Sequence, residues 1–179
     1  MKDLLSENFA EECIESKLIH KGSILEFKLD KVRLPNGKTS SRELVLHPGG
    51  IVIIPITRDG KFVLVEQYRY ATGEKLTEFP AGRLNLKEDP TEAARRELTE
   101  ETGYTAGKIE SLGFIYTAPG FCNEKLFMFL ATELQEGKPN PDEDEFVRTI
   151  HLSRDELSQK IKSREITDAK TIAGWGLIN

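Results

Sequence analysis

Residues 82–104 read GRLNLKEDPTEAARRELTEETGY, and the second half of this stretch predicts a helix over Pro90–Thr102. Asp89 can accept hydrogen bonds from the first turn while Glu92 reaches back to it, and proline suits the first helical position. Gly103 suits the left-handed conformation in which many helices end. The stretch therefore predicts both borders of one helix.

Three glutamates gather on one side of this predicted helix. With about 100° of rotation per residue, Glu97, Glu100 and Glu101 fall within one stripe, whereas Ala94 and Leu98 turn towards an apolar side. Carboxylates at these spacings repel one another, and the partly negative C-terminal end of the helix adds to the repulsion. A bound divalent cation would remove this conflict.

A solvated helix face is the alternative interpretation of these glutamates. Arg95 and Arg96 would then form ordinary ion pairs with Glu88, Glu92 or Glu100. The stripe alone favours this alternative. The spacing of the whole stretch favours the metal site.

That spacing resembles the Nudix box in every defining position. The defining positions are occupied here by Gly82, Glu88, Arg96-Glu97-Leu98, Glu100-Glu101 and Gly103-Tyr104. A match at so many fixed positions is far more specific than a lone glycine pattern. The chain is therefore identified as a member of the Nudix hydrolase superfamily, whose enzymes hydrolyse a nucleoside diphosphate linked to another group.

The resemblance implies a magnesium site, with Mn²⁺ as an alternative ion. Mg²⁺ takes oxygen ligands and keeps several waters, so it can bring carboxylates, phosphate oxygens and a water together. By resemblance, Glu97 and Glu101 are the principal ligands and the carbonyl of Ala81 contributes. Glu100 assists in metal binding and in catalysis.

The resemblance also assigns supporting roles within the box. Gly82 allows close approach of the backbone, and Gly103 ends the helix. Glu88 is expected to pair with Arg96, which would hold the preceding loop on the helix. Glu88 is not expected to be a metal ligand.

Composition limits the class of protein. A chain of 179 residues is long enough for one good core, or for one core with a small appended unit. The net charge of −5 and the lack of a basic stripe give no indication of a nucleic-acid partner. Cys13 and Cys122 indicate free thiols, and neither an export signal nor a membrane-spanning run is evident, so a cytoplasmic protein is expected.

Two regions are expected along the chain. In residues 1–47, Leu25, Phe27 and Leu29 alternate with polar residues, and a tight turn is expected at 35–37, which predicts a small antiparallel sheet. Such a sheet is marginal alone and needs another surface to pack on. Residues 48–179 are expected to form the Nudix domain.

The second region alternates strands with a few helices. Strands are expected near residues 51–57, 62–70, 76–79, 109–116, 124–134 and 146–152, and helices over 154–161 and after a cap at Thr167. This order predicts an α/β fold with helices on both faces of a sheet. With the resemblance, the expected fold is a Nudix α/β/α sandwich with a mixed central sheet and an N-terminal antiparallel β-sheet extension.

Segments outside the box resemble bacterial ADP-ribose pyrophosphatases. The resemblance rests on Glu66-Gln67-Tyr68-Arg69, Glu78-Phe79-Pro80-Ala81-Gly82 and Pro119-Gly120. It implies that ADP-ribose is split into AMP and ribose 5-phosphate by a homodimer whose N-terminal sheets are exchanged between subunits. The alternatives are hydrolysis of another nucleoside diphosphate sugar and a module that binds ADP-ribose without cleaving it.

Four residues are candidates for binding this substrate. Arg69 offers a planar fork of donors that suits a phosphate, and its alternative is a surface pair with Glu66. Arg42 is expected to reach the adenosine half, and by resemblance Glu124 holds the hydroxyls of the terminal ribose. Phe27 is a candidate for stacking on adenine, although core packing is the commoner role of such a residue.

The acidic run at 142–145 is the candidate source of a general base. Most such runs are solvated loops, but carboxylates that coordinate a metal are poor bases, so the reaction needs a further one. By resemblance, Glu143 is the candidate base and Glu145 a further metal ligand. A slip of two residues in the match would move the role of base to Glu145.

Overall fold

The computed structural model describes residues 9–140 and 146–179. The chain forms two compact units. The first contains the chain up to Pro48 together with Ala118–Glu124, and the second contains Gly49–Thr117 and Lys125–Asn179. The loop at 118–124 thus joins the N-terminal unit although it lies far away in the sequence.

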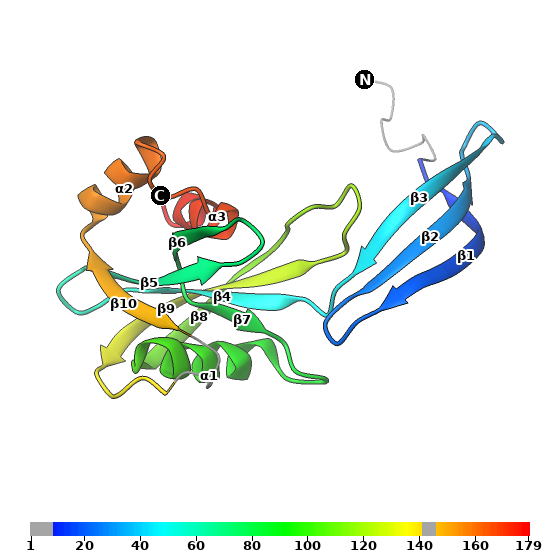
Figure 1. Ribbon diagram of the computed structural model, residues 1–179. Coiled ribbons are helices and arrows are strands. Elements are labelled where there is room, and N and C mark those ends of the chain that lie inside the picture. Colours follow the sequence, from blue (N-terminus) through cyan, green and yellow to red (C-terminus); the bar gives the residue numbers. More distant parts are fainter. Residues whose placement is uncertain (1–8, 141–145) are drawn as a thin grey trace, which may run out of the picture. The chain divides into compact units, whose positions relative to one another are not determined.

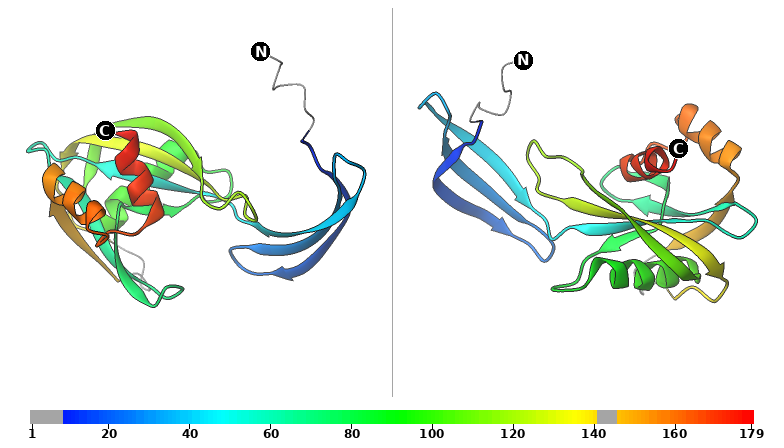
Figure 2. Two further views of the ribbon diagram at one scale, coloured as in Figure 1. Left: turned by 90° about the horizontal axis from the view of Figure 1, so that it is seen from above. Right: turned by 180° about the vertical axis from the view of Figure 1, so that it is seen from behind.

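The first unit is a three-stranded antiparallel sheet, seen from two sides in Figure 2. Its strands lie in the order β1 (Glu12–Lys21), β2 (Glu26–Arg33) and β3 (Thr39–Leu46). The expected tight turn joins β2 to β3, and Gly37 supplies its left-handed position at φ 80°. The antiparallel sheet predicted from the alternation of apolar residues is therefore confirmed.

This small sheet leaves much apolar surface uncovered within its own unit. Val32 is buried, whereas Ile14, Leu18 and Leu29 are exposed. The loop at 118–124 contacts the end of β3, where the Val45 amide donates to the Phe121 carbonyl at 2.8 Å. The exposed apolar residues leave a surface of this sheet on which another surface can pack.

The second unit contains two sheets. Its strands are β4 (Gly50–Pro55), β5 (Phe62–Arg69), β6 (Glu74–Glu78), β7 (Ala81–Arg83), β8 (Thr105–Tyr116), β9 (Lys125–Gln135) and β10 (Val147–Leu152). One sheet has the order β7-β4-β9-β8 and the other the order β10-β5-β6. The β4–β9 pair is parallel while β4–β7 and β8–β9 are antiparallel, so the sheet is mixed, as predicted.

Helices cover both sides of these sheets, which confirms the α/β/α sandwich. In Figure 1, α1 (Pro90–Thr102) lies on one side, and α2 (Arg154–Lys162) and α3 (Ala169–Leu177) lie on the other. Strand β4 shows why its sequence is wholly apolar. Ile51 and Ile53 pack in the core that contains Leu98 of α1, whereas Val52 and Ile54 pack in the core that contains Leu157 of α2.

The helix borders follow the capping residues. Asp89 accepts from the Thr91 amide at 2.9 Å, and Gly103 ends α1 at φ 76°, both as predicted. The cap expected at Thr167 is wrong by one residue, because Asp168 accepts from the Thr171 amide and begins α3. In the part of the chain that the structure describes, no helix is long and apolar enough to cross a membrane.

Candidate active site on helix α1

Helix α1 presents two buried carboxylates on one face. Glu97 is 7% exposed and Glu101 is 3% exposed, and they lie one turn apart on the same face. Glu100, on the same stripe, is partly exposed. The solvated-face interpretation is therefore wrong for Glu97 and Glu101, because a helix that merely displayed its charges to water would leave them exposed.

Arg96 joins three carboxylates around this face. Its Nη1 donates to Glu97 Oε1 at 2.7 Å and to Glu100 Oε2 at 2.9 Å, and its Nε and Nη2 donate to Glu88 at 2.9 and 3.0 Å. The hydrogen bonds with Glu88, and then those with Glu97 and Glu100, raise the pKa of Arg96. The expected Glu88–Arg96 pair is present, and it ties the loop before α1 to the helix.

The backbone of β7 lies directly against the two buried carboxylates. A Cβ atom built on Gly82 would lie 1.9 Å from Glu97 Cδ, closer than any real contact. The Ala81 amide donates to Glu101 Oε2 at 3.3 Å. Any side chain at position 82 would therefore displace the carboxylate of Glu97, which occupies that space.

The chemistry of these groups fits a hard divalent cation. Two buried carboxylates beside a strand backbone supply the oxygen donors that Mg²⁺ prefers. Across residues 9–140 and 146–179, however, no three His, Cys, Asp or Glu side chains are arranged to hold a metal. In the same structure Arg96 binds Glu97 and Glu100. The ligand roles of Glu97, Glu100 and Glu101 stay predictions.

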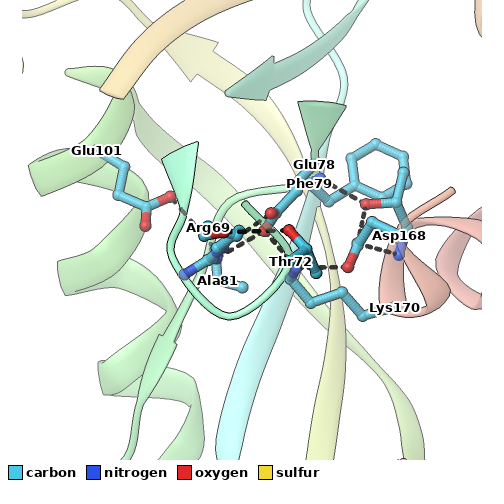
Figure 3. Close-up of polar contacts among 9 residues, drawn as sticks. Arg69, Thr72, Glu78, Phe79, Ala81, Glu101, Asp168 and Lys170 are labelled. Carbon is cyan, nitrogen blue, oxygen red and sulfur yellow. Dashed lines mark hydrogen bonds and ion pairs between the residues drawn. The ribbon is translucent and has the colours of Figure 1, made fainter. Parts of the chain in front are cut away.

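Arg69 lies close to this face and pairs with Glu78. Its Nε and Nη2 donate to Glu78 Oε1 and Oε2 at 2.8 and 2.6 Å, and its side chain is 39% exposed. Hydrogen bonding to Glu78 raises the pKa of Arg69, and the charge of Glu101 adds to this shift. Figure 3 shows Arg69 with Glu78, Ala81 and Glu101.

The alternative pairing of Arg69 with Glu66 is wrong. Residues an odd number apart on a strand point to opposite faces of the sheet, so Glu66 and Arg69 on β5 face away from each other. Glu66 instead accepts from Lys75 at 2.9 Å and from Arg148. Glu78 on β6 lies opposite Val65, on the face to which Arg69 also belongs.

Glu78 is a buried acid whose role the sequence did not indicate. It is 1% exposed and accepts from Arg69 and from Lys170 near the start of α3. Lys170 also donates to Asp168 at 2.9 Å. Glu78 belongs to the segment Glu78-Phe79-Pro80-Ala81-Gly82 that carries the family resemblance. Its partner Lys170, however, lies 92 residues away in the sequence, and no local pattern predicts such a pair.

Acid should weaken the fold through Glu78. Burial alone would raise the pKa of this carboxyl, but the hydrogen bonds and charges of Arg69 and Lys170 outweigh burial and hold the pKa below its ordinary value. The ionised form therefore stabilises the fold above the unfolded pKa of about 4.3, and this stabilisation is lost as the pH falls through the folded value. Below about pH 4, Glu78→Gln should lose less stability with falling pH than the wild type.

Urea unfolding followed by the fluorescence of Trp175, at pH 7 and at pH 3.5, measures this difference. Glu165→Gln is the matched control, because Glu165 is exposed and pairs with Lys160 on the surface. A Glu78→Gln variant that lost as much stability as the wild type between the two pH values would contradict the expectation.

The other substrate-binding candidates lie in the first unit. Arg42 on β3 donates through Nε to Glu11 at 2.9 Å, and Glu124 lies 3.3 Å from His47 Nδ1. Phe27 is half-buried on β2, opposite Val45. Their proposed contacts with substrate stay predictions.

The candidate base and the further metal ligand, Glu143 and Glu145, lie outside the described residues. The described chain resumes at Phe146, and β10 begins at Val147. Their roles also stay predictions.

Comparison with known proteins shows the family of this chain. The family model for the NUDIX domain matches residues 46–174. The chain is 41% identical to an ADP-ribose pyrophosphatase of Bacillus subtilis over 167 residues, which are 92% of this chain and 90% of that protein. It is 44% identical to a methanol dehydrogenase activator of Bacillus methanolicus over 166 residues, again 92% and 90% of the two chains.

A solved structure supports the fold. A crystal structure of an ADP compounds hydrolase matches 97% of this chain and 95% of its own, with a TM-score of 0.85 and 20% identity. The match to the family model includes β7, α1 and their buried carboxylates. This chain belongs to the Nudix hydrolase family.

Proposed function

We propose that this protein hydrolyses the pyrophosphate bond of ADP-ribose, with Mg²⁺ bound at α1, to give AMP and ribose 5-phosphate. The observation that carries the proposal is the pair of buried carboxylates, Glu97 and Glu101, held against the backbone of β7. The similarity to an ADP-ribose pyrophosphatase over nine tenths of both chains supports the choice of substrate.

Each residue of the site has its own role in the proposed reaction. Glu97 and Glu101 would hold Mg²⁺ with help from Glu100 and the Ala81 carbonyl. When bound, the ion neutralises charge on the diphosphate and makes a water more acidic. Arg69 offers its exposed edge to a phosphate oxygen.

A panel of nucleoside diphosphate sugars tests the substrate. Comparing kcat/KM for ADP-ribose, ADP-glucose and GDP-mannose in the presence of Mg²⁺ should show the highest value for ADP-ribose. Identifying the product that carries oxygen from ¹⁸O-labelled water shows which phosphorus is attacked. A higher kcat/KM for another sugar would make this protein a hydrolase of that nucleotide sugar.

A second candidate function comes from the relative named methanol dehydrogenase activator. The identity of 44% over 92% of this chain favours it as much as the pyrophosphatase. Adding this protein to methanol dehydrogenase from Bacillus methanolicus and measuring the turnover of the dehydrogenase tests the activity. The same assay with Glu101→Gln shows whether any activation requires the carboxylates of α1.

Glu143→Gln should lower kcat for ADP-ribose about a hundredfold and leave KM within about twofold. The reason is that Glu143 is proposed to accept the proton of the attacking water without coordinating the metal. Steady-state kinetics measure both constants, and Asp144→Asn is the neighbouring control. Unchanged turnover in Glu143→Gln would move the role of base to Glu145.

The protein should be a homodimer in which the N-terminal region, residues 1–47, forms the interface and completes the substrate site of the partner. The proposal is supported by the exposed apolar side chains Ile14, Leu18 and Leu29 on the first unit. Leu18→Glu should shift the protein towards monomer, whereas Ser23→Glu in the neighbouring turn adds the same charge and should not. Size-exclusion chromatography with light scattering at micromolar concentration measures this, and a monomeric wild type would contradict it.

Roles for Arg42, Glu124 and Phe27 in binding the adenosine and the terminal ribose depend on that dimer. A cytoplasmic location also stays a prediction.

A further inference from the structure

A continuous set of ionic contacts runs from the active-site face to the C-terminal helix. It begins at Arg69 on β5, passes through Glu78 on β6 and ends at Lys170 and Asp168 at the start of α3 (Figure 3). Only Arg69 of these residues has a role in the proposed reaction. The other three are 14% exposed or less.

Two cations share the one carboxylate of Glu78. Oε1 accepts from Arg69 Nε, while Oε2 accepts both from Arg69 Nη2 and from Lys170 Nζ. Lys170 therefore takes up part of the negative charge that would otherwise neutralise Arg69. The contacts that the described residues make with the side chain of Arg69 use Nε and Nη2, so its Nη1 edge remains to bind another anion.

Lys170 is held in place independently of Glu78. The hydroxyl of Thr171, in the same helix, accepts from the Phe79 amide at 2.8 Å, which docks the start of α3 on the chain next to Glu78. Farther along α3, a Cβ on Gly174 would lie 3.2 Å from Ile54 and from Phe79, so the helix packs closely on the sheet. This packing fixes the Lys170 ammonium beside the carboxylate.

We propose that Glu78 and Lys170 are positioning residues that orient Arg69 to bind the diphosphate of the substrate beside α1. The inference rests on the proposed function for the identity of the substrate. Glu78 fixes the plane of the guanidinium through two parallel hydrogen bonds, and Lys170 keeps Arg69 from being fully neutralised by Glu78. Helix α3 thereby contributes to binding through Lys170, which acts on Arg69 by way of Glu78.

A purely structural role for the network predicts a different result. If Lys170 only held α3 on the sheet, its loss would lower the melting temperature and leave affinity for a diphosphate unchanged. If it positions Arg69, its loss should weaken diphosphate binding even in a folded protein. Measuring the dissociation constant for a diphosphate therefore distinguishes the two roles.

The test compares Lys170→Met, Lys170→Gln and Lys170→Arg with the wild type. Isothermal titration with α,β-methylene-ADP-ribose and Mg²⁺ gives Kd, kinetics with ADP-ribose give KM and kcat, and calorimetry gives Tm. Lys170→Gln keeps a donor towards Glu78 and serves if Lys170→Met does not fold. Lys160→Met on α2 is the matched control, because Lys160 pairs with Glu165 at the surface.

Lys170→Met should raise Kd for the methylene analogue and KM for ADP-ribose about tenfold, with kcat within about threefold. Lys170→Arg should restore both constants, and Lys160→Met should leave them unchanged. A folded Lys170→Met with unaltered Kd would overturn the proposal, as would a wild type that does not bind the analogue. A wild type that binds the analogue, loses affinity in Lys170→Met and yet cleaves no ADP-ribose would support it while contradicting the proposed activity.

Discussion

Glu101→Gln is expected to lower kcat for ADP-ribose about a thousandfold while the protein stays folded. Glu101 is 3% exposed and accepts from the Ala81 amide, so it is fixed beside β7, whose Ala81 carbonyl is a proposed metal ligand. Glutamine has nearly the same shape, so packing should change little. It lacks the negative charge that is proposed to hold Mg²⁺ and that opposes the charge of Arg69.

Glu92→Gln on the same helix is the control for this change. Glu92 is exposed on the first turn of α1 and lies 3.9 Å from Arg95, away from the buried carboxylates. Its kcat should stay within about twofold of the wild type. Titration with Mg²⁺ followed by calorimetry should show that the wild type and Glu92→Gln gain Tm, whereas Glu101→Gln gains little.

The wild type and Glu101→Gln together distinguish an enzyme from a binding module. If the wild type bound ADP-ribose but formed no phosphate ester product, the protein would be a module that does not cleave it. Equal turnover of Glu101→Gln and the wild type would place the metal elsewhere and contradict the site on α1.

The border residues of α1 could be predicted because their signals are local. Asp89, Pro90 and Gly103 each act within one turn of the helix, so their positions in the sequence determine its ends. The mixed sheet could be predicted in outline, because an apolar strand such as β4 must be covered on both faces. Signals of this kind depend on neighbours in the sequence.

The partners of the charged residues could not be predicted, since they depend on contacts between distant segments. Glu78 meets Lys170, and the loop at 118–124 joins the N-terminal sheet, only because the strands and helices bring them together. Even the nearby pairing of Arg69 with Glu78, in place of the Glu66 pair considered from the sequence, depended on which residues share a face of the sheet. The sequence indicated that Arg96 could pair with Glu88 or Glu100, and both pairs are present. It did not show that the same guanidinium also binds Glu97.

Gly82→Ala should reduce kcat/KM for ADP-ribose at least about a hundredfold and change the free energy of unfolding by only about 1 kcal/mol. The added methyl would lie 2.0 and 2.4 Å from the two carboxylate oxygens of Glu97, so these oxygens must move. They lie at the end of a flexible side chain, and the movement costs little stability. It does, however, displace a proposed ligand from its place beside Glu101.

The value of this change is that it removes no charge and no hydrogen-bonding group. Loss of activity in Gly82→Ala would therefore show that the position of the Glu97 carboxylate, and not only its presence, is required. Gly176→Ala is the matched control, because a Cβ there meets nothing within 4 Å and no strained backbone angle opposes it. Steady-state kinetics and urea unfolding of both variants measure the two effects. If the Glu97 carboxylate served only to hold the loop through Arg96, it would tolerate a small shift. Full activity in Gly82→Ala would therefore mean that Glu97 is not a metal ligand.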